Sequence, residues 1–147
     1  MRKDRRGIEG LPLRLMPVAI LISLALPTML SCMQNATSSI AEGRAAEVAE
    51  DIAAIAEEMS AGGPGNVRTM TVPSDIPDGI TFGIGGRNGT VDCTRITWTI
   101  DGRENARYLS GVRIITESGG PLTISSGNSI RLVCPSGTWG TVKAVLA

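Results

Sequence analysis

An uncharged apolar run near the N-terminus constrains this chain more than any other feature. The run extends from residue 16 to residue 33 (MPVAILISLALPTMLSCM) and has no charge in 18 positions. As a helix it would span about 27 Å, close to the thickness of the hydrocarbon core of a bilayer. Residues 1–7 before it carry four cations and one anion, and basic flanks stay on the cytoplasmic side. The sequence therefore predicts delivery to a membrane, with the chain after about residue 34 on its outer side.

The end of the apolar run is compatible with two kinds of signal cleavage. An ordinary secretory signal would be cut after small residues near positions 27–31, where the sequence is Pro-Thr-Met-Leu-Ser. A lipoprotein signal would use Met-Leu-Ser-Cys at 29–32, which would make Cys32 the lipidated N-terminus. Otherwise Cys32 is interpreted as a small buried apolar residue.

A second apolar pattern follows and has the spacing of an amphipathic helix. Steps of four and three residues place its members on one helix face. These residues are Ala41, Ala45, Val48, Ile52, Ile55 and Met59. The sequence Gly62-Gly63-Pro64-Gly65 then ends the helix, because glycine adopts a left-handed cap and proline cannot continue a helix. We interpret the stripe as a face that packs against the chain's own β-domain, with a helix–helix oligomer as the alternative.

The remaining residues, 67–147, read as short strands separated by glycine-rich turns. Ile96, Trp98 and Ile100 alternate with threonine, and Asp101-Gly102 is a strong hairpin signal. Further strands are expected at 67–72, 107–109, 112–116, 122–125, 130–134 and 141–146. The predicted fold class is α+β: a long N-terminal hydrophobic and then amphipathic helix, followed by a small antiparallel β-sandwich or barrel-like head.

Two cysteines lie in predicted strands of this half, Cys93 and Cys134. Outside the cell we expect them to form a disulfide. For a separation of 41 residues the chain-entropy model gives about 4 kcal/mol of stabilisation. A zinc site is not expected, because two cysteines without histidine do not supply four ligands.

Two Asn-x-Thr sequons mark candidate glycosylation sites, at Asn35 and at Asn88. The second lies in a glycine-rich stretch, residues 83–89 (GIGGRNG). That stretch lacks the Gly-Lys-Ser/Thr ending and the following helix of a phosphate-binding loop, so we expect a flexible hairpin loop.

The composition argues against several classes of function. The chain has no histidine, which removes the commonest general base and metal ligand. It has four aromatic residues and 14 cations against 14 anions, so neither stacking nor charge favours nucleic acid. No Gly-x-Ser-x-Gly elbow is present. We expect no enzyme activity, no cofactor, no metal and no nucleic-acid partner.

Residues 5–15 (RRGIEGLPLRL) resemble the leader of archaeal type IV pilin-like proteins and archaellins. The resemblance implies that a prepilin peptidase cuts between Gly7 and Ile8 and leaves the apolar segment in place, a third alternative for processing. Residues 62–73 also resemble the exit from the helix in these proteins. One departure is Pro12, which stands where bacterial pilins have a glutamate.

The resemblance also implies a domain organisation and a function. Residues 1–7 would be a cleaved leader, 8–61 a helical stem, 62–66 a turn and 67–147 an extracellular head. The chain would be a major or minor structural subunit of an archaeal type IV pilus-like surface filament with a role in adhesion. Its partners would be the peptidase, other pilin-like subunits, and the membrane, crossed once before assembly. The alternative is a membrane-tethered or lipid-anchored β-domain outside the cell that binds a solute or a partner.

Overall fold

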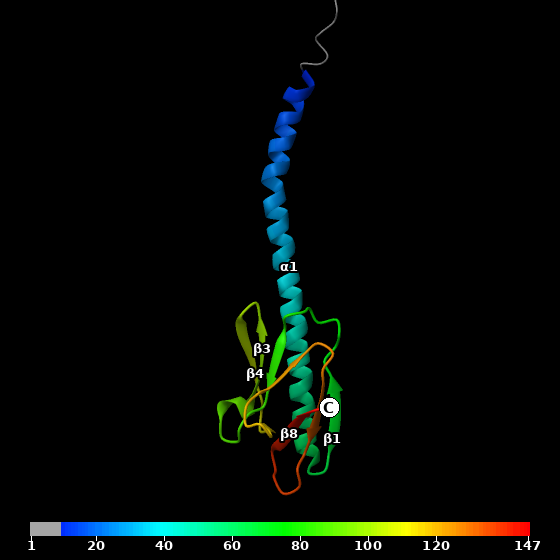
Figure 1. The fold of residues 1–147 in the computed structure, drawn as a ribbon, viewed down its shortest axis with the longest axis vertical. Coiled ribbons are helices and arrows are strands. Elements are labelled where there is room, and N and C mark those ends of the chain that lie inside the picture. Colours follow the sequence, from blue (N-terminus) through cyan, green and yellow to red (C-terminus); the bar gives the residue numbers. More distant parts are fainter. Residues whose placement is uncertain (1–9) are drawn as a thin grey trace, which may run out of the picture. The chain divides into compact units, whose positions relative to one another are not determined.

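The computed structural model describes residues 10–147, with side chains from residue 15 onward, and has an α+β fold (Figure 1). One long helix, α1 (Gly10–Gly62), precedes a head of eight strands and one 3-10 turn. The head elements are β1 (Val67–Thr71), β2 (Thr81–Ile84), η1 (Val91–Thr94), β3 (Arg95–Ile100), β4 (Arg103–Tyr108), β5 (Arg113–Thr116), β6 (Leu122–Ser125), β7 (Ser129–Val133) and β8 (Thr141–Leu146). Residues up to Ile40 and residues from Ala41 onward form two compact units.

The C-terminal end of α1 is set by local sequence. Gly63 has a φ of 86°, the left-handed conformation that closes a helix at little cost for glycine. Pro64 follows and cannot extend the helical hydrogen bonds. The side-chain amide of Asn66 donates a hydrogen bond to the Gly63 carbonyl at 3.2 Å. The helix therefore ends where the glycine-proline run predicts.

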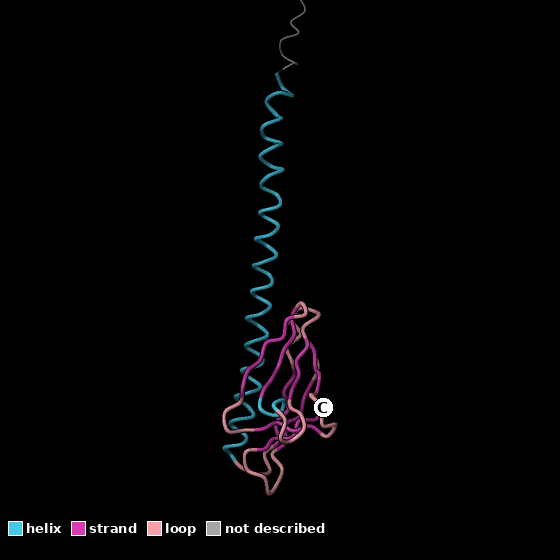
Figure 2. The backbone as a smooth tube through the Cα atoms, turned by 90° about the vertical axis from the view of Figure 1, so that its left-hand side faces the viewer, coloured by secondary structure: helices cyan, strands magenta, loops and turns pink. Residues whose placement is uncertain are grey.

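The strands form two four-stranded sheets, which are seen from a second side in Figure 2. Sheet A has the order β1-β7-β8-β5 and sheet B the order β4-β3-β2-β6. Every strand pair is antiparallel except β5 with β8, which run parallel. The predicted α+β fold with a predominantly antiparallel head is therefore confirmed, and β5 with β8 is its one parallel strand pair among the described residues. Residues 117–140, which contain β6 and β7, form the crossover that parallel neighbours require.

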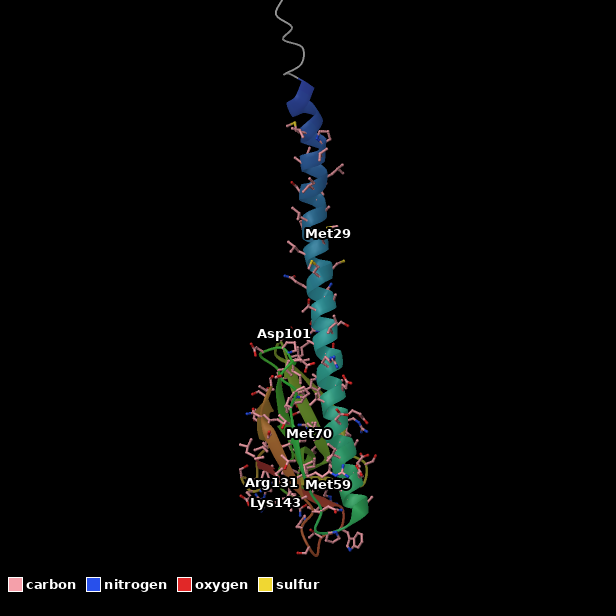
Figure 3. The ribbon with its side chains drawn as sticks, turned by 90° about the vertical axis from the view of Figure 1, so that its right-hand side faces the viewer. Met29, Met59, Met70, Asp101, Arg131 and Lys143 are labelled. Carbon is pink, nitrogen blue, oxygen red and sulfur yellow. The ribbon has the colours of Figure 1, made fainter. Side chains whose placement is uncertain are left out.

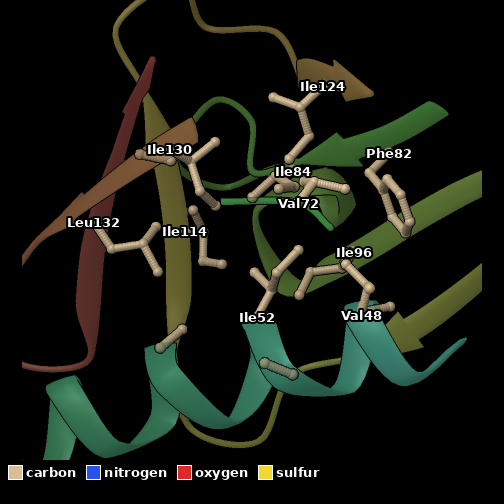
Figure 4. Close-up of a cluster of buried hydrophobic side chains, with 14 of the residues drawn as sticks. Val48, Ile52, Val72, Phe82, Ile84, Ile96, Ile114, Ile124, Ile130 and Leu132 are labelled. Carbon is tan, nitrogen blue, oxygen red and sulfur yellow. The ribbon is translucent and has the colours of Figure 1, made fainter. Parts of the chain in front are cut away.

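One hydrophobic core joins the two sheets and the last six turns of α1 (Figure 4). Ile52 of α1 lies between Ile114 of sheet A and Ile96 of sheet B, and all three are fully buried. Phe82 is the largest of the fully buried side chains and pairs with Trp98 across β2 and β3. The helix thus supplies one wall of the core of the head.

The glycine-rich stretch after β2 connects the sheets and is more than a flexible loop. Gly83 and Ile84 belong to β2, which corrects the expected loop boundary. Gly85 has a φ of 70°, and a Cβ atom there would lie 2.8 Å from the carbonyl oxygen of Ile114. The Gly86 amide donates to the same oxygen at 3.1 Å, and the Thr116 amide donates to the Gly86 carbonyl at 3.2 Å. These bonds tie the end of β2 to β5.

Candidate functional site

The first feature with functional meaning is the part of α1 that precedes the head, residues 15–40, which contains the apolar run. Its large apolar side chains are exposed at successive positions and so on every side of the helix. They are Leu15, Met16, Val18, Ile20, Leu21, Ile22, Leu24, Leu26, Met29, Leu30, Met33 and Ile40. By length and composition this helix is able to cross a membrane.

Three hydroxyl groups of this segment, those of Ser23, Thr28 and Thr37, have partners within the helix itself. Ser23 Oγ donates to the Ala19 carbonyl at 2.8 Å, and Thr37 Oγ1 donates to the Met33 carbonyl at 2.9 Å. Thr28 Oγ1 donates to the Ala25 carbonyl, three residues earlier, at 2.8 Å. Such internal bonds remove the cost of placing a hydroxyl in hydrocarbon. The segment therefore suits a medium without water.

Two prolines lie inside this helix, and the sequence alone suggests a break or a kink at each. The structure keeps the helix continuous through Pro17 and Pro27. Proline has no N–H, so Pro27 cannot donate to the Ser23 carbonyl, four residues earlier. Prolines occur in membrane helices because neighbouring groups pair with the freed carbonyl.

The second feature is the face of α1 that enters the core of the head. Five of the six residues in the predicted stripe are buried, namely Ala41, Ala45, Val48, Ile52 and Met59. Ile55 is half-buried at the margin. Ala49, Ala53 and Ala56 are also buried, and the pattern of large apolar residues missed them. The spacing of these alanines by four and three residues could have revealed them. They are buried because two sheets cover a wider face of the helix than a single line of large apolar residues.

Polar and charged groups of the head form ion pairs and hydrogen bonds with acidic residues at the edge of the buried face of α1. Arg107 on β4 contacts Glu50 through two nitrogens, with Nε–Oε2 at 2.5 Å and Nη2–Oε1 at 3.1 Å. The Ser110 amide donates to Glu57 Oε1 at 2.9 Å, and Arg68 Nη2 lies 2.8 Å from Glu58 Oε1. Arg107 lowers the pKa of Glu50, because its hydrogen bonds stabilise the carboxylate. These acidic residues therefore pair with groups of the head, while the side chains of Glu50 and Glu58 stay largely exposed to solvent.

The predicted disulfide is not formed in the structure, where Cys93 and Cys134 are free thiols. Cys93 lies in η1 and Cys134 follows β7. The prediction that both cysteines lie in strands is therefore wrong. The Cys93 thiol donates to the Thr90 carbonyl at 3.0 Å, and the Cys134 thiol to the Met59 carbonyl at 3.5 Å. In sheet A, β8 separates β7 from β5, the strand on which η1 packs. Burial raises the pKa of the Cys134 thiol.

The two sequons lie in different backbone environments. Asn35 is inside α1, and the hydroxyl of Thr37 in that sequon is already bonded within the helix. Asn88 is exposed in a turn in which the Thr90 amide donates to the Arg87 carbonyl at 3.0 Å. Gly89 at the third position of the turn has a φ of 90°. Asn88 is therefore the sequon in an open turn.

The predicted cleavage junction, Gly7 and Ile8, lies outside the described residues, as does the whole leader 1–7. Within residues 10–147 no group of three or more Cys, Asp or Glu residues is arranged to hold a metal ion. No protein-family model matches the sequence, and no curated protein or solved structure matches it.

Proposed function

We propose that this chain is a structural subunit of an archaeal type IV pilus-like surface filament. A prepilin peptidase would remove residues 1–7, and the apolar part of α1 would remain in the mature protein. Before assembly this segment would sit in the membrane with the head outside. In the filament it would be covered by the same segment of neighbouring subunits.

The observation that carries the proposal is the division of α1 into two parts with opposite surroundings. Residues 15–33 expose apolar side chains on every side, whereas residues 41–62 bury one face in the head. A cleaved signal would not need to continue as a helix into the core of the domain that it delivers. A retained stem does need a continuous helix, because the head has to stay attached to the segment that packs in the assembly.

Cleavage of the leader also has a physical role in the proposal. Its four cations hold the N-terminus at the cytoplasmic face, since moving charges through hydrocarbon is costly. Their removal lowers the cost of extracting the segment from the bilayer. Burial against other apolar segments then replaces the contact with lipid.

The test is the mass of the mature protein together with its location. We expect a mature N-terminus at Ile8, with or without a methyl group, and recovery of the chain in the filament fraction after cells are sheared. Gly7→Val should leave the full-length chain in the membrane. Gly43→Val is the matched control, because Gly43 is exposed and a Cβ there has open space.

Two outcomes would contradict the proposal. A mature N-terminus at Met1 or at Cys32 would show that the leader is not processed in this way. Recovery of the wild-type chain in membranes alone would favour a tethered binding domain.

A further inference from the structure

The outer face of sheet A carries three cationic side chains on three adjacent strands. Arg131 lies on β7, Lys143 on β8 and Arg113 on β5. Each is flanked along its strand by buried residues, so each points away from the core. Figure 3 shows Arg131 and Lys143 on the side of the head turned away from Met59 of α1.

The strand register places these cations on one diagonal line. Arg131 is paired with Val145, two residues from Lys143 in one direction along β8. Arg113 is paired with Thr141, two residues from Lys143 in the other direction. One strand across and two residues along is a step of about 8 Å, so the three cations span about 16 Å. We call this set the cationic diagonal.

Two of these cations have no partner within the head. Arg113 and Arg131 are exposed and form no ion pair among residues 15–147, and Lys143 Nζ lies 2.6 Å from Glu117. By contrast, Arg95 on sheet B has carboxylates of Asp92 and Glu104 at 2.9 and 3.7 Å. Half-buried apolar side chains lie beside the cationic diagonal. They are Val133, Val145 and Ile115.

The opposite side of the head presents an acidic ridge of matching length. Glu47, Asp51 and Glu58 are exposed on the side of α1 that faces away from the core. Glu58 follows Glu47 by eleven positions, which is a rise of about 16.5 Å along the helix. Asp51 forms no ion pair in the described part of the chain, whereas Glu47 and Glu58 pair with Arg44 and Arg68 at the surface. Exposed pairs of this kind contribute little and exchange partners readily.

We propose that the acidic ridge of one copy of this chain docks on the cationic diagonal of the next copy. This inference rests on the proposed filament function and names the contact between heads. The two surfaces lie on opposite sides of one head, so the contact joins different patches and each bound copy leaves one patch free. A contact of that kind extends into an open assembly unless the rotation closes a ring. Opposite charges fix the register of such a contact and accelerate encounter.

Charge reversal in the full-length chain tests the contact. Arg113→Glu with Arg131→Glu should lower the amount of protein in the sheared filament fraction at least about tenfold. Arg103→Glu on β4 is the control, because this arginine is exposed, has no ion pair among the described residues and belongs to sheet B. The control should assemble like the wild type. Equal amounts of chain in the membrane before assembly, with equal resistance to protease, would show that both variants fold.

The reciprocal change identifies the occupant. Glu47→Arg with Glu58→Arg, at the two ends of the ridge, should also prevent assembly. Combining this change with Arg113→Glu and Arg131→Glu should restore at least about a third of the filament yield, since the charges are then exchanged. If the wild type is in the filament fraction and the charge-reversal variants assemble equally well, the docking contact is wrong but the proposed filament function is not. Failure of the four-site variant to recover would exclude a second copy as the occupant. Absence of the wild type from the filament fraction would refute both the filament and the contact.

Discussion

Ile52 provides a direct test of the finding that the C-terminal part of α1 packs in the hydrophobic core of the head. It is fully buried, whereas Ile40 on the same helix is 67% exposed. Ile52→Ala removes three carbon atoms, worth about 2.4 kcal/mol at about 0.8 kcal/mol for each buried methylene. The cavity adds to this loss, and measured replacements of this kind cost about 2–5 kcal/mol. We expect the free energy of unfolding to fall by about 3–4 kcal/mol.

The measurement is urea unfolding of the full chain in a mild detergent, followed by tryptophan fluorescence. Trp98 is buried at 8% exposure and should report unfolding, whereas Trp139 is 79% exposed and should change little. Ile40→Ala is the matched control and should change the free energy by less than about 0.5 kcal/mol. An Ile52→Ala chain that unfolds within about 1 kcal/mol of the wild type would refute the packing of α1 in the core.

Two further predictions concern titratable groups. Because Arg107 lowers the folded-state pKa of Glu50, the ion pair stabilises the head above the ordinary carboxyl value of 4.5, and this contribution is lost as the pH falls through the lowered value. The wild type should therefore resist urea better than Glu50→Gln at pH 6, with the difference shrinking as acid is added; a constant difference would contradict the pairing. For the cysteines, a thiol reagent without reductant should label Cys32 in the native protein and also Cys93 and Cys134 after unfolding. Labelling of Cys32 alone in the unfolded chain would show that the disulfide forms after all.

Local sequence was sufficient for several elements of the fold. The left-handed Gly63 and the following Pro64 end the helix at the predicted turn. Asp101 and Gly102 both have positive φ, at 49° and 77°, as their hairpin turn requires. Alternation located β3, where Ile96 and Trp98 are buried. In each case the deciding interaction lies within a few residues of the pattern.

Pairing between distant segments could not be predicted in the same way. The parallel alignment of β5 with β8 depends on how residues 117–140 return across the head. β2 was not predicted as a strand, because Gly83 and Gly85 resemble a loop until Thr97 is placed beside the first and Ile114 beside the second. The distance between Cys93 and Cys134 depends on strand order, which the count of intervening residues does not give.

Both apolar patterns are visible in the residues alone: an uncharged run, and then a stripe with helical spacing. These follow from side-chain hydrophobicity and helix geometry, which are local properties. That the stripe packs on two sheets follows from the folded arrangement of the head. The same arrangement places acidic and cationic side chains on opposite sides of the head. A charge such as Glu50 finds its partner, Arg107, on a segment far away in the chain. The register between such segments is fixed by the packing of the whole core, which no local pattern specifies.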